Sequence, residues 1–279
     1  MFNLIKMDLY RLLRSNSTYV MVILTASIAV FSIYTVYLVQ NMTEKDLPPS
    51  TESIDTESDD LSFGIYVDTD PQWINGDIDY SEMLGTHLQS GLMLILVSVF
   101  ASLFVAAERK NGFVKNIAGQ FRNRRIMVAA KLAVIAVQVL ILLVTFALSV
   151  LIGCLIFWGD QIVLTSIPKL LQLAGLQYLL HFAFACLIIF LCLLTNSAAF
   201  SMTTGILLCS GFGGLIYGLI DRVAGNSFRI EKYMLESNIS SVGAGVPSDV
   251  VIQAMFIGIG YILVTMILSM LIVQKRDIK

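Results

Sequence analysis

The chain has 279 residues, of which 57% are hydrophobic and 14% are charged, and its mean hydropathy is +0.80. This composition is too apolar for an ordinary soluble domain and indicates a membrane protein. The formal net charge is −2, and we expect no nucleic-acid partner.

Six stretches are long and apolar enough to cross a bilayer as helices, which takes about 20 residues each. We therefore predict an all-α membrane protein, with residues 1–279 forming a single transmembrane domain of six transmembrane helices. The predicted spans are Thr18–Gln40, Leu88–Ala107, Leu132–Trp158, Gln172–Leu194, Ser197–Ile220 and Val250–Val273.

Residues 1–16 are predicted to form a helix in the inner membrane interface, because they are too short and too charged to span. Apolar residues recur on one face of this helix, as in amphipathic helices that lie on a membrane. The apolar face carries Phe2, Ile5, Leu9, Leu12 and Leu13, and the opposite face carries Asn3, Arg11 and Arg14.

Residues 41–87 are predicted to form a large acidic outer loop. Residues 43–60 are rich in acidic, Pro, Ser and Thr residues, a composition typical of disorder. Residues 63–80 alternate apolar and polar side chains around turn signals, which favours a small hairpin cap. The loop's carboxylates lack the spacing of a calcium-binding loop, so we expect no metal site.

The stretch 108–131 carries seven basic residues and one acid between two apolar runs. With both termini in the cytoplasm, the inner segments hold 13 of the 18 Lys and Arg residues, and the outer segments hold 17 of the 20 acids. Because Lys and Arg accumulate on the cytoplasmic side, this asymmetry predicts cytoplasmic termini and a cytoplasmic 108–131 segment. The basic side also favours anionic membrane lipids.

The later part of the chain adds a tight turn and a glycine-rich span. Thr195–Ser197 is the break between the fourth and fifth spans and forms the tip of a predicted helical hairpin. In the fifth span, Gly214 and Gly218 have the small-xxx-small spacing of close helix packing. Packing within the subunit is one interpretation, and packing against a second subunit or a hinge is the other. Residues 223–248 are predicted to form a second outer loop with a short helix.

Motifs for catalysis or nucleotide binding are missing from this sequence. It has no P-loop and no metalloprotease motif, so we expect no cofactor on the chain and no enzymatic activity. Gln138, Gln177 and His181 could line a polar path through the helices, although a hydrogen-bonded packing role for His181 fits equally well. A membrane protein without its own energy source is passive, a receptor, or driven by a partner.

The segment after the second span resembles the first cytoplasmic loop of ABC-2-type exporter permeases. Glu108 and Gly112 match the Glu-x-x-x-Gly element that closes the second span in that family. Two departures are Phe113, where the family often has Thr, and the sequence 121–124, where it often has Pro-x-Ser-Arg. The chain is most similar to the lantibiotic-immunity and bacitracin-resistance permeases of Gram-positive bacteria. Further matching residues are Lys115, Asn116, Arg124, Arg125 and Lys131.

The resemblance implies that a cytoplasmic ABC ATPase docks on this segment. Phe113, Ile117 and Phe121 would form one apolar ridge of a helix, suited to a groove on the ATPase. We expect Glu108 to pair with a nearby basic residue, either as a latch that opens when the loop moves or as a static anchor. The expected ATPase-coupling residues are Glu108, Gly112, Phe113, Ile117, Phe121, Arg124 and Arg125.

The resulting prediction is the permease subunit of an ATP-driven exporter in a bacterial cell membrane. The resemblance implies two ATPase copies, which bind ATP and Mg²⁺, and a second permease that is identical or paralogous. The expected cargo is amphiphilic, with an antimicrobial peptide as the favoured class. The alternative is a membrane sensor or scaffold that acts through its basic cytoplasmic loop.

Overall fold

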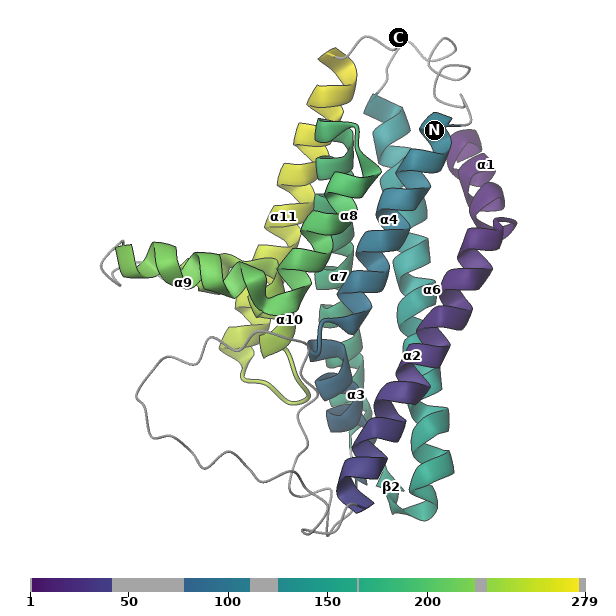
Figure 1. Ribbon diagram of the computed structural model, residues 1–279, viewed down its shortest axis with the longest axis vertical. Coiled ribbons are helices and arrows are strands. Elements are labelled where there is room, and N and C mark those ends of the chain that lie inside the picture. The colour runs from purple at the N-terminus through teal and green to yellow at the C-terminus, as the bar shows by residue number, and fades with distance from the viewer. Residues whose placement is uncertain (1, 42–77, 111–124, 165, 224–229, 276–279) are drawn as a thin grey trace.

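The computed structural model describes residues 2–41, 78–110, 125–164, 166–223 and 230–275 (Figure 1). The predicted all-α class is confirmed, because the two strands have only two residues each. The elements are α1 (Phe2–Leu13), α2 (Asn16–Asn41), β1 (Ile78–Asp79), α3 (Tyr80–Gln89), α4 (Leu92–Lys110), α6 (Arg125–Phe157), η2 (Gly159–Gln161), β2 (Ile162–Val163), α7 (Ile167–Thr195), α8 (Ala198–Leu207), η3 (Leu208–Phe212), α9 (Gly213–Val223), η4 (Ile230–Tyr233), α10 (Leu235–Ser241) and α11 (Ser248–Lys275).

Four helices in the described part of the chain are long and apolar enough to cross a membrane: α2, α6, α7 and α11. Two bent pairs raise this number to as many as six if each pair is one span. The α3–α4 pair bends by 55° and the α8–α9 pair by 63°. The structure therefore supports a polytopic membrane protein with between four and six spans.

Both bends occur at a glycine in the left-handed region of backbone space. Gly91 has φ +78° and Gly211 has φ +80°, a conformation that disfavours side chains bearing a Cβ. Between α8 and α9, the bend is accompanied by the single π-helical turn η3, which breaks the regular helical hydrogen bonding. The second and fifth apolar stretches of the sequence are thus not straight helices.

Helix α7 forms the centre of the bundle and packs against α4, α6, α8 and α11. Its side chains at Leu180, Phe184 and Ile188 are fully buried. On the other side of the molecule, α2 packs along α6. Since α7 touches most of the other long helices, its inward-facing residues lie in the interior of the bundle.

The predicted hairpin at Thr195–Ser197 is confirmed as a tight turn between α7 and α8. Asn196 adopts a left-handed conformation with φ 57°, which Asn tolerates better than most residues. The Ser197 side chain then caps α8 by accepting a hydrogen bond from the Phe200 N–H at 3.2 Å. Local side-chain chemistry thus accounts for this reversal of the chain.

The segment predicted as a large outer loop ends in an ordered helix, α3. Asp79 caps this helix by accepting a hydrogen bond from the Ser81 N–H at 2.9 Å. Ile78 and Asp79 pair in parallel with Ile162 and Val163. The rest of the predicted hairpin cap, and the acidic stretch before it, lie outside the described residues.

One end of the bundle gathers α1, the last turn of α4, the first turns of α6, the α7–α8 turn and the end of α11 (Figure 1). We call this the basic end, because its residues include Lys6, Arg11, Arg14, Arg109, Lys110, Arg125, Lys131 and Lys275.

At the opposite end, aromatic residues join α2 to α6. The Tyr37 and Phe157 rings stack at 5.0 Å, and Trp158 donates a hydrogen bond to Gln40 Oε1 at 2.9 Å. Tyr and Trp, whose rings carry a polar group, are typical of a membrane–water boundary.

Candidate functional site

The basic end holds both borders of the predicted coupling segment. Helix α4 ends at Lys110 and α6 begins at Arg125, so the chain between them leaves and re-enters the bundle at the same end (Figure 1). Glu108 belongs to the last turn of α4. The remaining predicted coupling residues before Arg125 lie outside the described residues: Gly112, Phe113, Ile117, Phe121 and Arg124.

Arg125 connects the start of α6 to the end of α11. Its Nε and Nη2 groups both donate hydrogen bonds to Gln274 Oε1, at 2.8 Å and 2.5 Å. This contact holds the start of α6 to the end of α11 beside the predicted coupling segment. The structure thus pairs Arg125 with Gln274, a contact that the sequence did not indicate.

Helix α1 is packed against the start of α6. Leu4 and Ala130 form a small buried contact, and Leu12 is 1% exposed. The Thr18 hydroxyl donates a hydrogen bond to the Leu12 carbonyl at 2.7 Å across the joint between α1 and α2. The other side of α1 leaves Tyr10 62% exposed, so α1 presents an outer face as part of the basic end.

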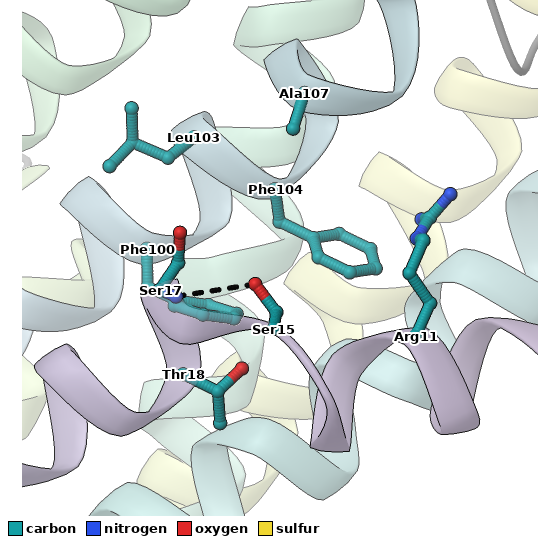
Figure 2. A pocket seen from close by; sticks show the side chains of 8 residues that line it. All are labelled: Arg11, Ser15, Ser17, Thr18, Phe100, Leu103, Phe104 and Ala107. Carbon is teal, nitrogen blue, oxygen red and sulfur yellow. Dashed lines mark hydrogen bonds between the residues drawn. The ribbon is translucent and has the colours of Figure 1, made fainter. Parts of the chain in front are cut away.

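A pocket of about 140 Å³ lies at the joint between α1 and α2, beside the last turns of α4 (Figure 2). Its only charged lining residue within the described chain is Arg11, whose guanidinium carbon lies 5.1 Å from the centre of the Phe104 ring. This geometry is a cation–π contact. The pocket is lined by Arg11, Ser15, Ser17, Thr18, Phe100, Leu103, Phe104 and Ala107.

The predicted polar path consists of three fully buried side chains in the bundle: Gln138 on α6, and Gln177 and His181 on α7. Gln177 Nε2 donates hydrogen bonds to the carbonyls of Ile239 and Val242, at 3.1 Å and 2.8 Å. His181 Nδ1 lies 2.7 Å from the Gln177 carbonyl. Gln177 therefore holds α10 and the residue after it against α7, which is a packing role.

Gln138 and His181 retain buried polar atoms without a hydrogen-bond partner among the described residues. These atoms are both amide atoms of Gln138 and Nε2 of His181. Such atoms are rare and destabilising unless water or another group satisfies them. All three path residues are closed off from solvent in this conformation, so a path along them would require the helices to separate.

A family model described as ABC-2 family transporter protein matches residues 4–212, which is 209 of the 279 residues. The chain belongs to the ABC-2 transporter family. The ABC-2 match covers α1 to η3 and ends where α9 begins. A search among curated proteins finds no match to the chain.

Membership of the ABC-2 family makes this chain the permease component of an ABC transporter, a membrane subunit that works with an ABC ATPase. Permeases of this family are transport subunits and are generally not catalytic themselves. Together with the apolar helices, the family indicates a multi-pass protein of the cell membrane. The basic end and the buried polar side chains are therefore the candidate sites of a transport protein.

A close helix approach in the described part of this ABC-2 permease involves Gly205, a glycine that sequence reasoning did not single out. A Cβ added to Gly205 would lie 2.5 Å from Ser98 Cβ and 2.9 Å from the end of the Ile188 side chain. One turn away, the Ser102 and Ser201 hydroxyls lie 2.8 Å apart and join α4 to α8. The small-xxx-small spacing of Ser201 and Gly205 is the signal that could have found this contact.

Gly214 and Gly218, the predicted packing glycines, lie on α9. A Cβ added to Gly214 would meet no atom within 4 Å, and α9 projects away from the bundle (Figure 1). Gly214 therefore does not mediate a close helix approach within the described chain. The interpretation based on a second subunit or a hinge stays a prediction.

A half-buried carboxyl group at Glu236 was also missed. Glu236 on α10 accepts a hydrogen bond from the Tyr217 hydroxyl on α9, and its Oε1 atom occupies the space that a Cβ of Gly213 would need. Burial raises the pKa of the Glu236 carboxyl above its usual 4.5, and the Tyr217 hydrogen bond opposes part of that shift. This contact ties α9 to α10 near the bend, and no sequence motif marks it.

Proposed function

We propose that the chain is the permease of an ATP-driven exporter that moves an amphiphilic substrate, with a cationic antimicrobial peptide as the favoured class. It would work in the membrane of a Gram-positive bacterium, as the lantibiotic-immunity and bacitracin-resistance type does. The observation that carries the proposal is the basic end. It brings α1, both borders of the 111–124 segment and the end of α11 to one side of the bundle.

The proposed mechanism uses the basic end as the docking surface for two ATPase subunits, which bind ATP and Mg²⁺. Each ATPase would accept the apolar ridge at Phe113, Ile117 and Phe121 in a groove. ATP binding would then stabilise one of two permease conformations over the other. Because Arg125 hydrogen-bonds Gln274, movement of the segment would be passed to α6 and α11 together.

The polar residues in the interior are proposed to meet the cargo only after the helices move. Gln138 and His181 are fully buried, and they carry polar atoms that a separated state could hydrate. Hydration would offset the cost of these atoms, so it would favour the open conformation. A second permease, identical or paralogous, is proposed to complete the path.

Cargo selection is proposed to involve charge on the outer side. Residues 43–60 carry seven acidic residues and one basic residue, which would attract a cationic peptide over a distance set by the salt concentration. ATPase activity of the complex in lipid vesicles tests this step. We expect a cationic amphiphilic peptide to stimulate hydrolysis and a length-matched anionic peptide to have no effect.

Co-purification of the full-length chain with the ATPase encoded beside it tests the coupling assignment. We expect the triple variant Glu108→Ala, Phe113→Ala, Ile117→Ala to weaken ATPase binding by about tenfold or more, as loss of a central interface cluster does. The matched control is Asp160→Ala, Leu164→Ala, Ile167→Ala, which removes one acid and two exposed apolar side chains at the opposite end.

Two results would count against the proposal in different ways. Equal ATPase binding by the triple variant and the control would show that 108–117 is not the docking surface. A wild-type chain that retains no ATPase would contradict the exporter itself, and a sensor or scaffold role would then explain the basic end better.

A further inference from the structure

The pocket between α1, α2 and α4 combines one positive charge with hydroxyl groups and an apolar wall. Arg11, Ser15, Ser17 and Thr18 supply the polar side, and no acidic residue is among the described residues that line it. The apolar side consists of Phe100, Leu103, Phe104 and Ala107. Such a lining suits a ligand that carries a negative charge at one end and an apolar group at the other.

Arg11 is held in place at this pocket by two contacts. Its Nη2 lies 3.6 Å from Asp8 Oδ1, and its guanidinium lies over the Phe104 ring. A guanidinium presents five N–H donors in a planar fork, so it can bind an anion while it stays beside a carboxylate. Arginine is well suited to phosphate because the fork matches two phosphate oxygens at once.

The size and position of the pocket favour a lipid headgroup over a whole molecule. Its volume of about 140 Å³ equals the liquid volume of roughly five water molecules, which is room for a phosphate group but not for acyl chains. Apolar surface continues from the wall of the pocket along α4 and α2. Leu103 is 41% exposed on α4, and Tyr19 and Val20, which follow Thr18 on α2, are 59% and 60% exposed.

We propose that this pocket binds the phosphate of an anionic phospholipid, with Arg11 as the charged contact and Leu103 beside the acyl chains. The site lies at the basic end, where α2 enters the apolar part of the protein and α4 leaves it (Figures 1 and 2). Because Ala107 directly precedes Glu108, a bound lipid would contact the helix turn that leads into the coupling segment. Binding requires neither the ATPase nor the cargo.

The test is lipid binding to the purified full-length chain in detergent, measured by native mass spectrometry and by the unfolding temperature. Phosphatidylglycerol, phosphatidylcholine and inorganic phosphate are compared. We expect phosphatidylglycerol alone to bind and to raise the unfolding temperature. Arg11→Gln should weaken this binding by about tenfold, the effect of losing a charged hydrogen-bonding partner.

Two further variants separate the site from general charge and from misfolding. Arg14→Gln removes a charge from the same end, but Arg14 hydrogen-bonds Tyr10 and does not line the pocket, so binding should be unchanged. Ala107→Leu fills the pocket and keeps Arg11, so binding should fall as in Arg11→Gln.

Three results would overturn the proposal. Equal losses in Arg11→Gln and Arg14→Gln would mean that charge at the basic end attracts the lipid without a defined site. Unchanged binding in Ala107→Leu would place the lipid elsewhere. An equal rise in unfolding temperature with inorganic phosphate would show that the source is free phosphate, which contradicts the lipid assignment.

Discussion

Both bent helix pairs turn at a glycine with positive φ, and the two bends lie next to each other in the molecule. Gly91 turns α3 into α4, and Gly211 lies within the break between α8 and α9, both with φ near +80°. A Cβ added to Gly91 would lie 3.1 Å from the Cys209 carbonyl oxygen in η3. The two bends therefore lie against each other, although they are more than a hundred residues apart in the sequence.

The short helices beside the two bends end up in opposite surroundings. Helix α3 packs against α6, α7 and α10, and its Met83, Leu84 and Leu88 side chains are at most 1% exposed. Helix α9 turns away from the bundle (Figure 1) and leaves Ile216, Leu219 and Ile220 between 43% and 62% exposed. A glycine with positive φ allows the chain to turn, but neighbouring helices decide whether the turned helix is buried.

The largest effect on stability is expected from Gly205→Leu, which would push α8 away from α4 and α7. Because Gly205 lies against Ser98 and Ile188, a larger side chain should destabilise the fold by about 3 kcal/mol through overpacking. The unfolding temperature in detergent measures this. The control Gly214→Leu enters open space and should be neutral; equal losses in both variants would contradict the described packing.

A smaller effect is expected when either bend glycine becomes alanine. Gly91→Ala and Gly211→Ala should each cost about 1–2 kcal/mol, the penalty for a left-handed residue with a Cβ. Gly91→Ala should cost more, because its Cβ would also press on the Cys209 carbonyl. Unfolding temperatures rank the two variants, and a harmless Gly91→Ala would show that α3 is not held by this bend.

A still smaller effect on stability is expected from loss of the hydrogen bond between Ser32 on α2 and His87 on α3. Ser32 Oγ lies 2.8 Å from His87 Nδ1, and both side chains are buried. A double-mutant cycle with Ser32→Ala and His87→Ala should give a coupling of about 1 kcal/mol, the net value of one hydrogen bond. A coupling of zero would mean that apolar packing alone buries α3.

The smallest effect should come from the contact that ties α9 to α10. Burial raises the pKa of Glu236, so its contribution to stability is present at low pH and is lost as pH rises through the raised pKa. Glu236→Gln should remove this pH dependence and stabilise the protein slightly near neutral pH. Unfolding temperatures between pH ~4 and ~8 test it.

Glu231→Gln is the matched control for that series. Glu231 is exposed in η4, five residues before Glu236, so its replacement should leave the pH profile unchanged. A profile that changes equally in both variants would show that charge in this region, and not the Glu236 carboxyl in particular, controls the stability of α9 and α10.

Much of the architecture could be predicted because it depends on local composition. Long apolar runs predicted α2, α6, α7 and α11, and Asn196 with Ser197 marked the turn between α7 and α8. The bends at Gly91 and Gly211 were not predicted, since glycine is common in membrane helices and its φ depends on neighbours. Helix α3 was assigned to a loop because its burial comes from contacts with distant helices.

Some features of the candidate sites also follow from local composition, whereas others depend on contacts between distant helices. The sequence alone identified the basic segment at 108–131, because charge asymmetry is visible without contacts, and it identified Gln138, Gln177 and His181 as polar residues within apolar runs. Only the tertiary structure paired Gln177 with the Ile239 and Val242 carbonyls. The reason is that a hydrogen bond between residues so far apart depends on how the helices pack.

The sequence by itself determined that this protein is helical, membrane-embedded and charged asymmetrically, since these properties follow from residue types and their order. The tertiary structure decided which glycine allows close helix approach, where the Arg11 pocket forms and why α3 is buried while α9 projects. These outcomes depend on the shapes of helices that are distant in the chain, and Gly91 against Cys209 is the clearest case.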